Sequence, residues 1–421
     1  MMYRIRVLIP TLAAILTIII IINVVVAPIA IHPRKLLLRI DREIGLEKRV
    51  GMPIITSLDR IDNLFYIVWA KPHLNNELIP YLYNITYDIY DIVHGYLIYS
   101  GSLSLGGAWL LGIYKGSIIT VRNSTIYSYG LGDGTIYRLH IGLEGRPYTA
   151  VIYSNILLMQ YGKYLLNIDL HRWRINWISE LGLGETGNSI RLILVNPGSR
   201  NIIVYYLSLD TGEAGLIAVD WLGNIVWNSG LPRDIRELMQ PGGLLLVGEY
   251  LLIPLKNYTI IFMDTANGDI INRLEVLPEL VKVGRYRVLP LSNDKILVAY
   301  FGGAAHHYQL IDIYSNETLW SGRINVDGAD LNGHITTRDN EIIFIRQLTN
   351  DLQIVGVALE NEEIRWKRYL GVSGYIPYGV FKSYDEERMV LLLMEKGALA
   401  NILSGKPFKG KLMVITWETT G

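Results

Sequence analysis

The chain has 421 residues, with 39 basic and 39 acidic side chains and no cysteine. The balanced charge excludes the strong basic excess that is typical of nucleic-acid binders. The missing cysteine excludes disulfide scaffolds, thiolate metal sites, iron–sulfur clusters and cysteine nucleophiles. Only five glutamines occur, and depletion of thermolabile Cys and Gln is typical of a thermophile.

The first predicted element is a membrane segment. After a short tail, residues 1–6, the chain has 25 uncharged residues from Val7 to Ile31. A helix of this length extends roughly 37 Å and can cross a hydrocarbon core of about 30 Å. We therefore predict one N-terminal transmembrane helix over 7–31, a single-pass anchor in the cell membrane. A cleaved signal peptide is the alternative, but its apolar region is normally only about 7–15 residues long.

The side of the membrane is indicated differently by two patterns. More basic residues follow the membrane segment than precede it, which favours a cytoplasmic C-terminal domain. Four Asn-x-Ser/Thr sequons, which are possible glycosylation sites, favour the opposite side. Their asparagines are Asn84, Asn123, Asn257 and Asn316. We expect an extracytoplasmic domain, mainly because of the fold resemblance given below.

A linker is predicted over residues 32–50, followed by a single large domain over 51–421. Within the linker, Lys35–Asp41 reads as an isolated strand. Such a strand could join the last sheet of the domain and close a ring, which hides sheet edges that would otherwise aggregate.

The large domain repeats a unit of four β-type runs separated by Gly, Asn, Asp and Pro clusters. The clearest copy has runs at Arg191–Asn196, Asn201–Leu209, Gly215–Asp220 and Ile225–Leu231. The next copy has runs at Leu244–Glu249, Leu251–Asn257, Thr259–Asp264 and Ile270–Val276. Leu231–Gln240 is at most a short helix.

One position of the unit carries a bulky side chain in nearly every copy. These anchor positions are Tyr137, Trp177, Trp227, Asn272, Trp320 and Trp366, spaced 40 to 50 residues apart. Four strands at this period predict an all-β propeller, in which a wide ring fills the wedge between neighbouring blades. We predict about eight four-stranded blades, with seven as the alternative count and one or two β-sandwiches as the alternative fold. The predicted blades are 51–105, 106–145, 146–185, 186–232, 243–280, 284–328, 333–372 and 375–418.

Three segments carry a family resemblance. VDWLGNIVW at Val219–Trp227, IDIYSNETLW at Ile311–Trp320 and LENEEIRW at Leu359–Trp366 resemble repeats of the quinoprotein-like, or PQQ-like, β-propeller family. The dehydrogenases of that family imply a bound quinone, a calcium ion and commonly an adjacent cysteine pair. This chain has no cysteine, and we cannot place the family's calcium and base carboxylates on it. The resemblance therefore favours the non-catalytic, membrane-anchored members.

Other candidate sites favour structural interpretations. Asp327–His334 resembles part of a calcium loop, but Gly328 stands where the first ligand belongs, so we expect a polar turn. His306 and His307 would face opposite ways on a strand, and we expect them in a loop at a blade edge. The acidic runs Asp385–Glu387 and Asn361–Glu363 are typical of solvated turns. We assign no catalytic, cofactor-binding or metal-binding residue and no cofactor.

Tyrosine is the one surplus, with 28 residues against six phenylalanines. Six crowd the first unit: Tyr81, Tyr83, Tyr87, Tyr90, Tyr96 and Tyr99. They indicate either a contact surface or simply good strand formers. We predict a membrane-anchored scaffold that binds another membrane or surface protein and no nucleic acid. The alternatives are an extracytoplasmic enzyme with its site in the propeller channel and a glycan-binding surface component.

Overall fold

The structure is a computed structural model that describes most of the chain. The described residues are 36–49, 52–59, 63–70, 81–182, 188–196, 198, 200–208, 212–239, 243–276, 285–291, 294–302, 305–325, 334–338, 341–347, 352–358, 364–382, 388–404 and 406–419. Within these ranges no helix is long and apolar enough to cross a membrane, and segment 7–31 lies outside them.

Two compact units divide the chain. One comprises Ile40–Ile415, and the other comprises Met1–Arg39 with Thr416–Gly421. In the second unit the described residues are the first of β1 (Leu36–Arg49) and the last of β31 (Phe408–Thr419). Apart from those strand ends, the sheets and sites below belong to Ile40–Ile415.

The strands of the described residues form seven sheets. One sheet has seven strands: β2 (Met52–Asp59), β3 (Leu64–Ala70), β4 (Tyr81–Asp91), β5 (Tyr96–Tyr114), β6 (Ser117–Arg122), β7 (Thr125–Gly130) and β8 (Ile136–His140). The next three have four strands each: β9 (Pro147–Tyr153), β10 (Ile156–Tyr161), β11 (Tyr164–Asp169) and β12 (Arg174–Glu180); β13 (Asn188–Asn196), β14 (Asn201–Ser208), β15 (Ala214–Asp220) and β16 (Ile225–Gly230); β17 (Leu245–Val247), β18 (Tyr250–Pro254), β19 (Thr259–Asp264) and β20 (Ile270–Glu275).

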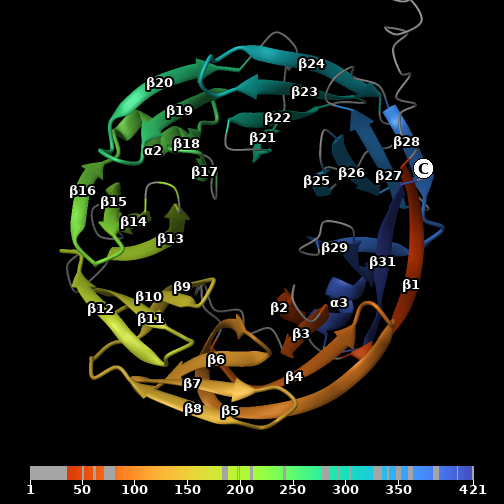
Figure 1. The fold of residues 1–421 in the computed structure, drawn as a ribbon, viewed down its shortest axis with the longest axis horizontal. Helices are drawn as coiled ribbons and strands as arrows, with labels where there is room; N and C mark the ends of the chain where they lie inside the picture. Colours follow the sequence, from red (N-terminus) through yellow and green to blue (C-terminus); the bar gives the residue numbers. More distant parts are fainter. Residues whose placement is uncertain are drawn as a thin grey trace, which may run out of the picture. The chain divides into compact units, whose positions relative to one another are not determined.

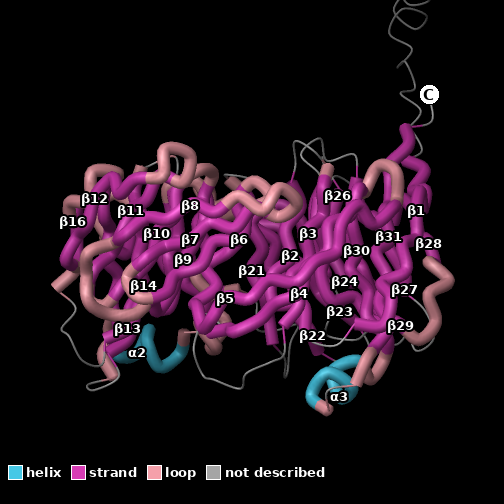
Figure 2. The backbone as a smooth tube through the Cα atoms, turned by 90° about the horizontal axis from the view of Figure 1, so that it is seen from below, coloured by secondary structure: helices cyan, strands magenta, loops and turns pink. Residues whose placement is uncertain are grey.

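The remaining sheets also have four strands each. They are β21 (Arg285–Pro290), β22 (Lys295–Gly302), β23 (Ala305–Asp312) and β24 (Thr318–Asn325); β25 (His334–Arg338), β26 (Glu341–Gln347), β27 (Leu352–Ala358) and β28 (Ile364–Tyr369); and β1, β31, β30 (Arg388–Glu395) and β29 (Tyr375–Lys382). Two short helices, α2 (Arg233–Leu238) and α3 (Ala398–Leu403), both lie on the same side of the sheets (Figure 2).

The sheets follow one another around a common centre in chain order, which is a β-propeller arrangement (Figure 1). The first strand of a sheet, such as β9, lies nearest the centre, and the fourth, such as β12, lies at the periphery. The last sheet combines both ends of the chain, since β1 lies beside β31. It contacts the first sheet, because the Tyr378 hydroxyl donates a hydrogen bond to the Pro53 carbonyl at 2.9 Å.

The prediction of eight separate four-stranded blades is wrong. The predicted units 51–105 and 106–145 share one seven-stranded sheet, because β5 runs for 19 residues across the expected boundary. Gly106 and Gly107 lie at that boundary with φ of 62° and 79°, in the left-handed region that glycine tolerates. They redirect the strand without ending it, as glycines do at β-bulges. The predicted boundary extends the phase of the later copies, and that phase does not distinguish two strands from one long bent strand.

The two clearest predicted copies are confirmed. All eight of their runs correspond to strands β13 to β20, and the predicted short helix is α2. The middle strands are almost entirely buried, as in β10 and β15, whereas the outer strand β12 alternates between exposed and half-buried residues. Burial on both faces explains why the middle runs are continuously apolar rather than alternating.

The anchor positions all lie in the last strand of their sheets, which is β8 for Tyr137 and the fourth strand for the other five. In the sheets from β9 to β28, the strand register shifts directly beside the anchor, which marks a repeated bulge. Two indoles reach the next sheet. The Trp177 N–H donates to the Trp221 carbonyl at 2.8 Å, and the Trp227 N–H donates to the Thr265 carbonyl at 3.0 Å. The predicted role of the rings between neighbouring sheets is confirmed at these positions.

An aspartate closes the hairpin before the fourth strand in several sheets. The Asp220 Oδ1 accepts hydrogen bonds from the backbone N–H groups of Leu222 and Asn224, both at 2.8 Å. A side-chain hydrogen bond from Asn224, together with these N–H groups, lowers the pKa of Asp220. Hydrogen bonds from turn backbone likewise lower the pKa of Asp133, Asp169 and Asp312.

Acid is expected to destabilise the fold below about pH 5. These aspartates have lower pKa values in the folded chain than the usual value of about 3.9, so the unfolded chain binds protons first as the pH falls. Their contribution to the free energy of unfolding is complete above the unfolded pKa and is lost as the pH falls through the folded pKa. Urea unfolding at several pH values between about pH 7 and pH 3 measures this loss of stability. The variant Asp220→Asn keeps a hydrogen-bond acceptor but does not titrate, so its free energy of unfolding should fall less steeply with pH. A fall identical to that of the parent would contradict the assignment.

Candidate functional site

The four sequon asparagines are all exposed. Asn84 lies in β4, and the other three lie in hairpin turns. Asn123 and Asn316 have φ of 47° and 58°, a left-handed conformation that asparagine adopts more readily than most residues. Their side chains are therefore accessible to solvent, as glycan attachment requires; their modification stays a prediction.

The residues considered for metal or acid chemistry are only partly described. His306 and His307 lie within strand β23, opposite Phe301 and Tyr300 of β22, so the expected loop is wrong. Of Asp327–His334, only His334 is described, at the start of β25. The acidic runs at 361–363 and 385–387 lie outside the described residues. Across the described part of the chain, no group of three or more His, Asp or Glu could hold a metal ion.

The tyrosines of the first unit divide into two groups. Tyr87 and Tyr90 are buried in the seven-stranded sheet, so for them the strand-former interpretation holds. Tyr83, Tyr96 and Tyr99 are 57%, 53% and 44% exposed. Exposed aromatic side chains of this size are typical of contact surfaces.

The first half of strand β5 pairs with a described strand on one side only. Residues from Tyr96 to Trp109 pair with β4, whereas β6 pairs only with Trp109–Tyr114. The second edge of Tyr96–Ser104, here called the β5 edge, therefore faces no strand among the described residues. No residue of this segment is buried. An unpaired edge offers backbone N–H and C=O groups to another strand.

The β5 edge is more apolar than the other outer strands. Four consecutive large apolar side chains, Tyr96 to Tyr99, are at least 42% exposed. In the other described outer strands such runs reach two residues: Ile136 and Tyr137 in β8, Ile225 and Val226 in β16, Ile270 and Ile271 in β20. The longer run singles out β5.

Local packing holds the β5 edge in a fixed shape. The Tyr87 and Tyr99 rings are stacked with their centres 5.8 Å apart. Both rings lie over Gly101, where a Cβ atom would come within 2.7 Å of Tyr87 and 2.9 Å of Tyr99. Glycine is therefore needed at this position, because any side chain would push the rings apart. The edge is thus preorganised, which lowers the entropy lost on binding.

The hairpin that leads into the β5 edge is closed by Asp91. Its carboxylate accepts hydrogen bonds from the backbone N–H groups of Val93 and His94, both at 2.8 Å, and lies 2.7 Å from the His94 ring. Burial raises the pKa of Asp91, but the hydrogen bonds from His94 and Val93 outweigh it and lower the pKa. The charged carboxylate therefore fixes where the exposed strand begins.

A groove of about 860 Å³ lies where the seven-stranded sheet meets the β9–β12 sheet. Its walls come from the ends of inner strands and from turns: residues 57–58, Tyr66, 113–116, 152–155 and His171. Among the described lining residues, Lys115 and His171 are basic and none carries a carboxylate. The Tyr114 hydroxyl is buried without a hydrogen-bond partner in the described part of the chain.

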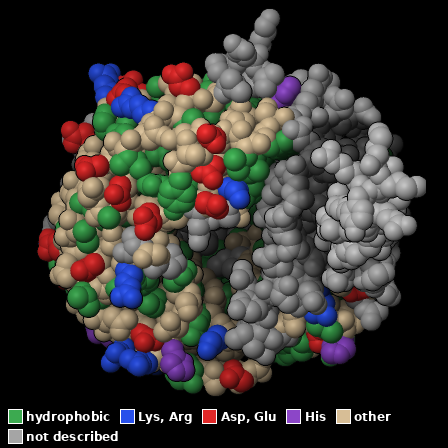
Figure 3. Space-filling view, turned by 45° about the horizontal axis from the view of Figure 1, so that its top comes forward, with side chains coloured by type: hydrophobic (Ala, Val, Ile, Leu, Met, Phe, Trp, Pro, Cys, Tyr) green, Lys and Arg blue, Asp and Glu red, His purple; other side chains and the backbone are tan. Residues whose placement is uncertain are grey.

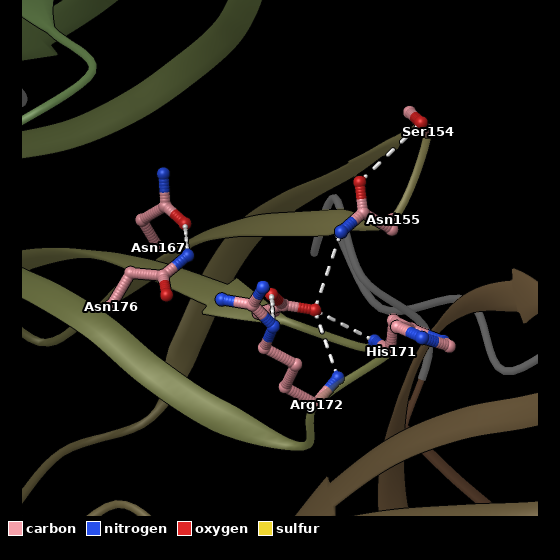
Figure 4. A network of polar contacts seen from close by, with 7 residues as sticks. Ser154, Asn155, Asn167, His171, Arg172 and Asn176 are labelled. Atoms are coloured by element: carbon pink, nitrogen blue, oxygen red, sulfur yellow. Dashed lines mark hydrogen bonds and ion pairs between the residues drawn. The ribbon is translucent and has the colours of Figure 1, made fainter.

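One carboxylate positions the turns beside the groove (Figure 4). The Asp169 Oδ1 accepts hydrogen bonds from the backbone N–H groups of His171 and Arg172 at 2.9 Å, and from the Asn155 side-chain amide at 3.3 Å. The Arg172 Nε lies 4.0 Å from Asp169 Oδ2. Asp169 therefore ties together the two turns that carry Asn155 and His171. Figure 4 shows the His171 ring pointing away from this carboxylate.

The rest of the visible surface is mixed in character. Figure 3 shows acidic and basic side chains interspersed with apolar ones on one face, where the described residues form no continuous basic patch. This distribution agrees with the zero net charge of the chain.

No family model and no curated protein matches this chain. Solved structures do match over most of its length. The computationally designed Ika8 protein has a TM-score of 0.53 at 10% identity, covering 89% of this chain and 98% of its own. Quinohemoprotein alcohol dehydrogenase from Comamonas testosteroni has a TM-score of 0.51 at 9% identity, covering 90% and 76%. Sqt1 from Saccharomyces cerevisiae has a TM-score of 0.50 at 9% identity, covering 90% and 99%.

These similarities show the fold alone, because the identities are so low. They confirm the β-propeller arrangement and its likeness to a quinone-dependent enzyme. The non-catalytic, membrane-anchored type is not shown by them.

Sequence reasoning found the tyrosines but missed the groove. Its residues are separated by up to about a hundred positions, and only the closure of neighbouring sheets brings them together. The signal that was available is local: the polar stretches that contain Lys115, Asn155 and His171 each follow an apolar run.

Proposed function

We propose that this chain is a protein-binding scaffold that docks a partner protein at the β5 edge. The observation that carries the proposal is a run of four consecutive exposed apolar side chains on a strand whose second edge faces no described strand. Their contiguity supports a contact surface, because single exposed apolar residues are ordinary.

The partner at this edge is an extended protein segment. Between the two register shifts of β5, Tyr99 to Ser104 form a regular ladder with β4, which is the length of an average strand. A partner strand laid against them would take backbone hydrogen bonds from the edge, with side-chain contacts giving specificity. Its apolar side chains would cover Ile98 and the exposed tyrosines.

The proposal includes a location. The chain is held at a membrane through its uncharged segment 7–31, with the propeller on the extracytoplasmic side and glycans on the sequon asparagines. The length of the uncharged run and the exposure of all four asparagines support this. The partner is then another membrane or surface protein.

Substitution in β5 tests the docking site. Ile98→Lys adds a charge to the proposed contact, whereas Ile178→Lys adds the same charge to the outer strand β12. The two isoleucines are 46% and 42% exposed, so both variants should keep the urea midpoint of the parent within about 0.5 kcal/mol. Tagged full-length chains are purified from the native membrane fraction, and stoichiometric partners are compared.

A partner recovered with the parent and with Ile178→Lys, but reduced at least about tenfold with Ile98→Lys, supports the proposal. Equal recovery with all three chains would contradict docking at β5. Recovery of the chain in the soluble fraction would contradict membrane attachment, and four unmodified sequon asparagines would contradict the extracytoplasmic, glycosylated state.

A further inference from the structure

We propose that the groove between the seven-stranded sheet and the β9–β12 sheet is a second binding site, which takes an acidic, partly apolar peptide segment of a partner protein. The site is separate from the β5 edge, and neither proposal depends on the other. Its chemistry follows from the charges and the apolar walls described in turn below.

The charge of the groove selects an anion. Lys115 and His171 are the basic groups among the lining side chains that the structure describes, and none of those side chains is acidic. The nearby Asp169 carboxylate is occupied by the N–H donors of its own turn and of Asn155, and its side chain is only 10% exposed. A ligand in the groove therefore meets basic groups and neutral donors, which favour a carboxylate.

The apolar part of the groove favours a peptide over a free inorganic anion. Leu58, Ile113 and Ile152 line the groove together with Tyr153, whose residue is 38% exposed. The volume of about 860 Å³ lies in the range of roughly 300–1,000 Å³ that suits organic ligands. A segment that alternates acidic and aliphatic residues would place carboxylates near the basic groups and aliphatic side chains against these walls.

Peptide titration of the full-length chain in detergent tests the site. The probe is a capped hexapeptide that alternates glutamate with leucine, and the matched control peptide has glutamine in place of glutamate. The glutamate peptide should bind at least about tenfold more tightly than the glutamine peptide. The double substitution Lys115→Gln with His171→Gln should remove this preference, while Lys256→Gln, on an exposed residue of the β18–β19 turn, should leave it unchanged.

The urea midpoint of the double variant separates binding from folding. Lys115 and His171 are both exposed, so the midpoint should stay within about 0.5 kcal/mol of the parent while the preference for the glutamate peptide is lost. Equal affinity for the two peptides, binding that survives the double substitution, or no binding of either peptide would overturn the proposal. Full competition by acetate at the peptide concentration would also overturn it, since the site would then bind a small anion alone.

Discussion

Replacing Trp227 by alanine is expected to lower the free energy of unfolding by about 2–3 kcal/mol. The indole N–H donates to the Thr265 carbonyl at 3.0 Å, and the ring covers Gly268 of the same turn. Gly268 has φ of 80°, and a Cβ atom there would lie 2.8 Å from the ring. Truncation therefore removes both a hydrogen bond and the packing between two neighbouring sheets.

Ile225→Ala is the matched control for Trp227→Ala. Ile225 lies two positions earlier in β16 and is 44% exposed, so its truncation should change the stability by no more than about 0.5 kcal/mol. Both variants are compared by their urea midpoints. Equal shifts would show that Trp227 does not join the two sheets.

Deleting residues 1–49 is expected to unfold the last sheet, since it removes β1. Ile44 and Leu46 are 7% and 3% exposed and belong to the core cluster that also contains Leu412 of β31. Burial of these two side chains contributes about 3–6 kcal/mol in all. The deletion also leaves the outer edge of β31 unpaired, so we expect aggregation and a strongly lowered Tm.

A shorter deletion, of residues 1–35, keeps all of β1 and should retain the Tm of the parent. Leu46→Ala is a milder version of the long deletion. The Leu46 side chain lies over Gly410 of β31, where a Cβ atom would come within 2.8 Å of its Cδ1. A fall of about 2–4 kcal/mol is expected for this variant. Equal Tm values for the deletion of residues 1–49 and the deletion of residues 1–35 would exclude a role of β1 in the last sheet.

The sequence predicts the repeated strands correctly where turn residues separate the apolar stretches. Each predicted run between Arg191 and Val276 lies on an observed strand, because Gly, Asn and Asp turns separate apolar stretches there. The sequence does not predict that one strand continues through Gly106 and Gly107, because a glycine pair is equally compatible with a turn and with a bent continuous strand. The count of separate sheets depended on that one local choice.

The candidate sites were only half accessible to sequence reasoning. The crowding of tyrosines marked the first unit, but no pattern tells which strand edge stays unpaired, because that depends on where β6 begins to pair. His306 and His307 looked like loop residues beside glycines, yet their backbone continues the β22–β23 ladder. Lys115 and His171 line the same groove because two sheets pack side by side. Sheet packing imposes no fixed spacing between residues in the sequence, so the sequence does not predict this pair.

Hydrogen exchange of segment 96–104 tests the central claim most directly. In the isolated full-length chain, the amides of this segment that face away from β4 should exchange rapidly, since no described strand pairs with them. In the complex purified from native membranes, the same amides should exchange at least about tenfold more slowly, while segment 174–180 of β12 remains unchanged. Equal exchange of segment 96–104 in the free and bound chain would contradict docking at the β5 edge.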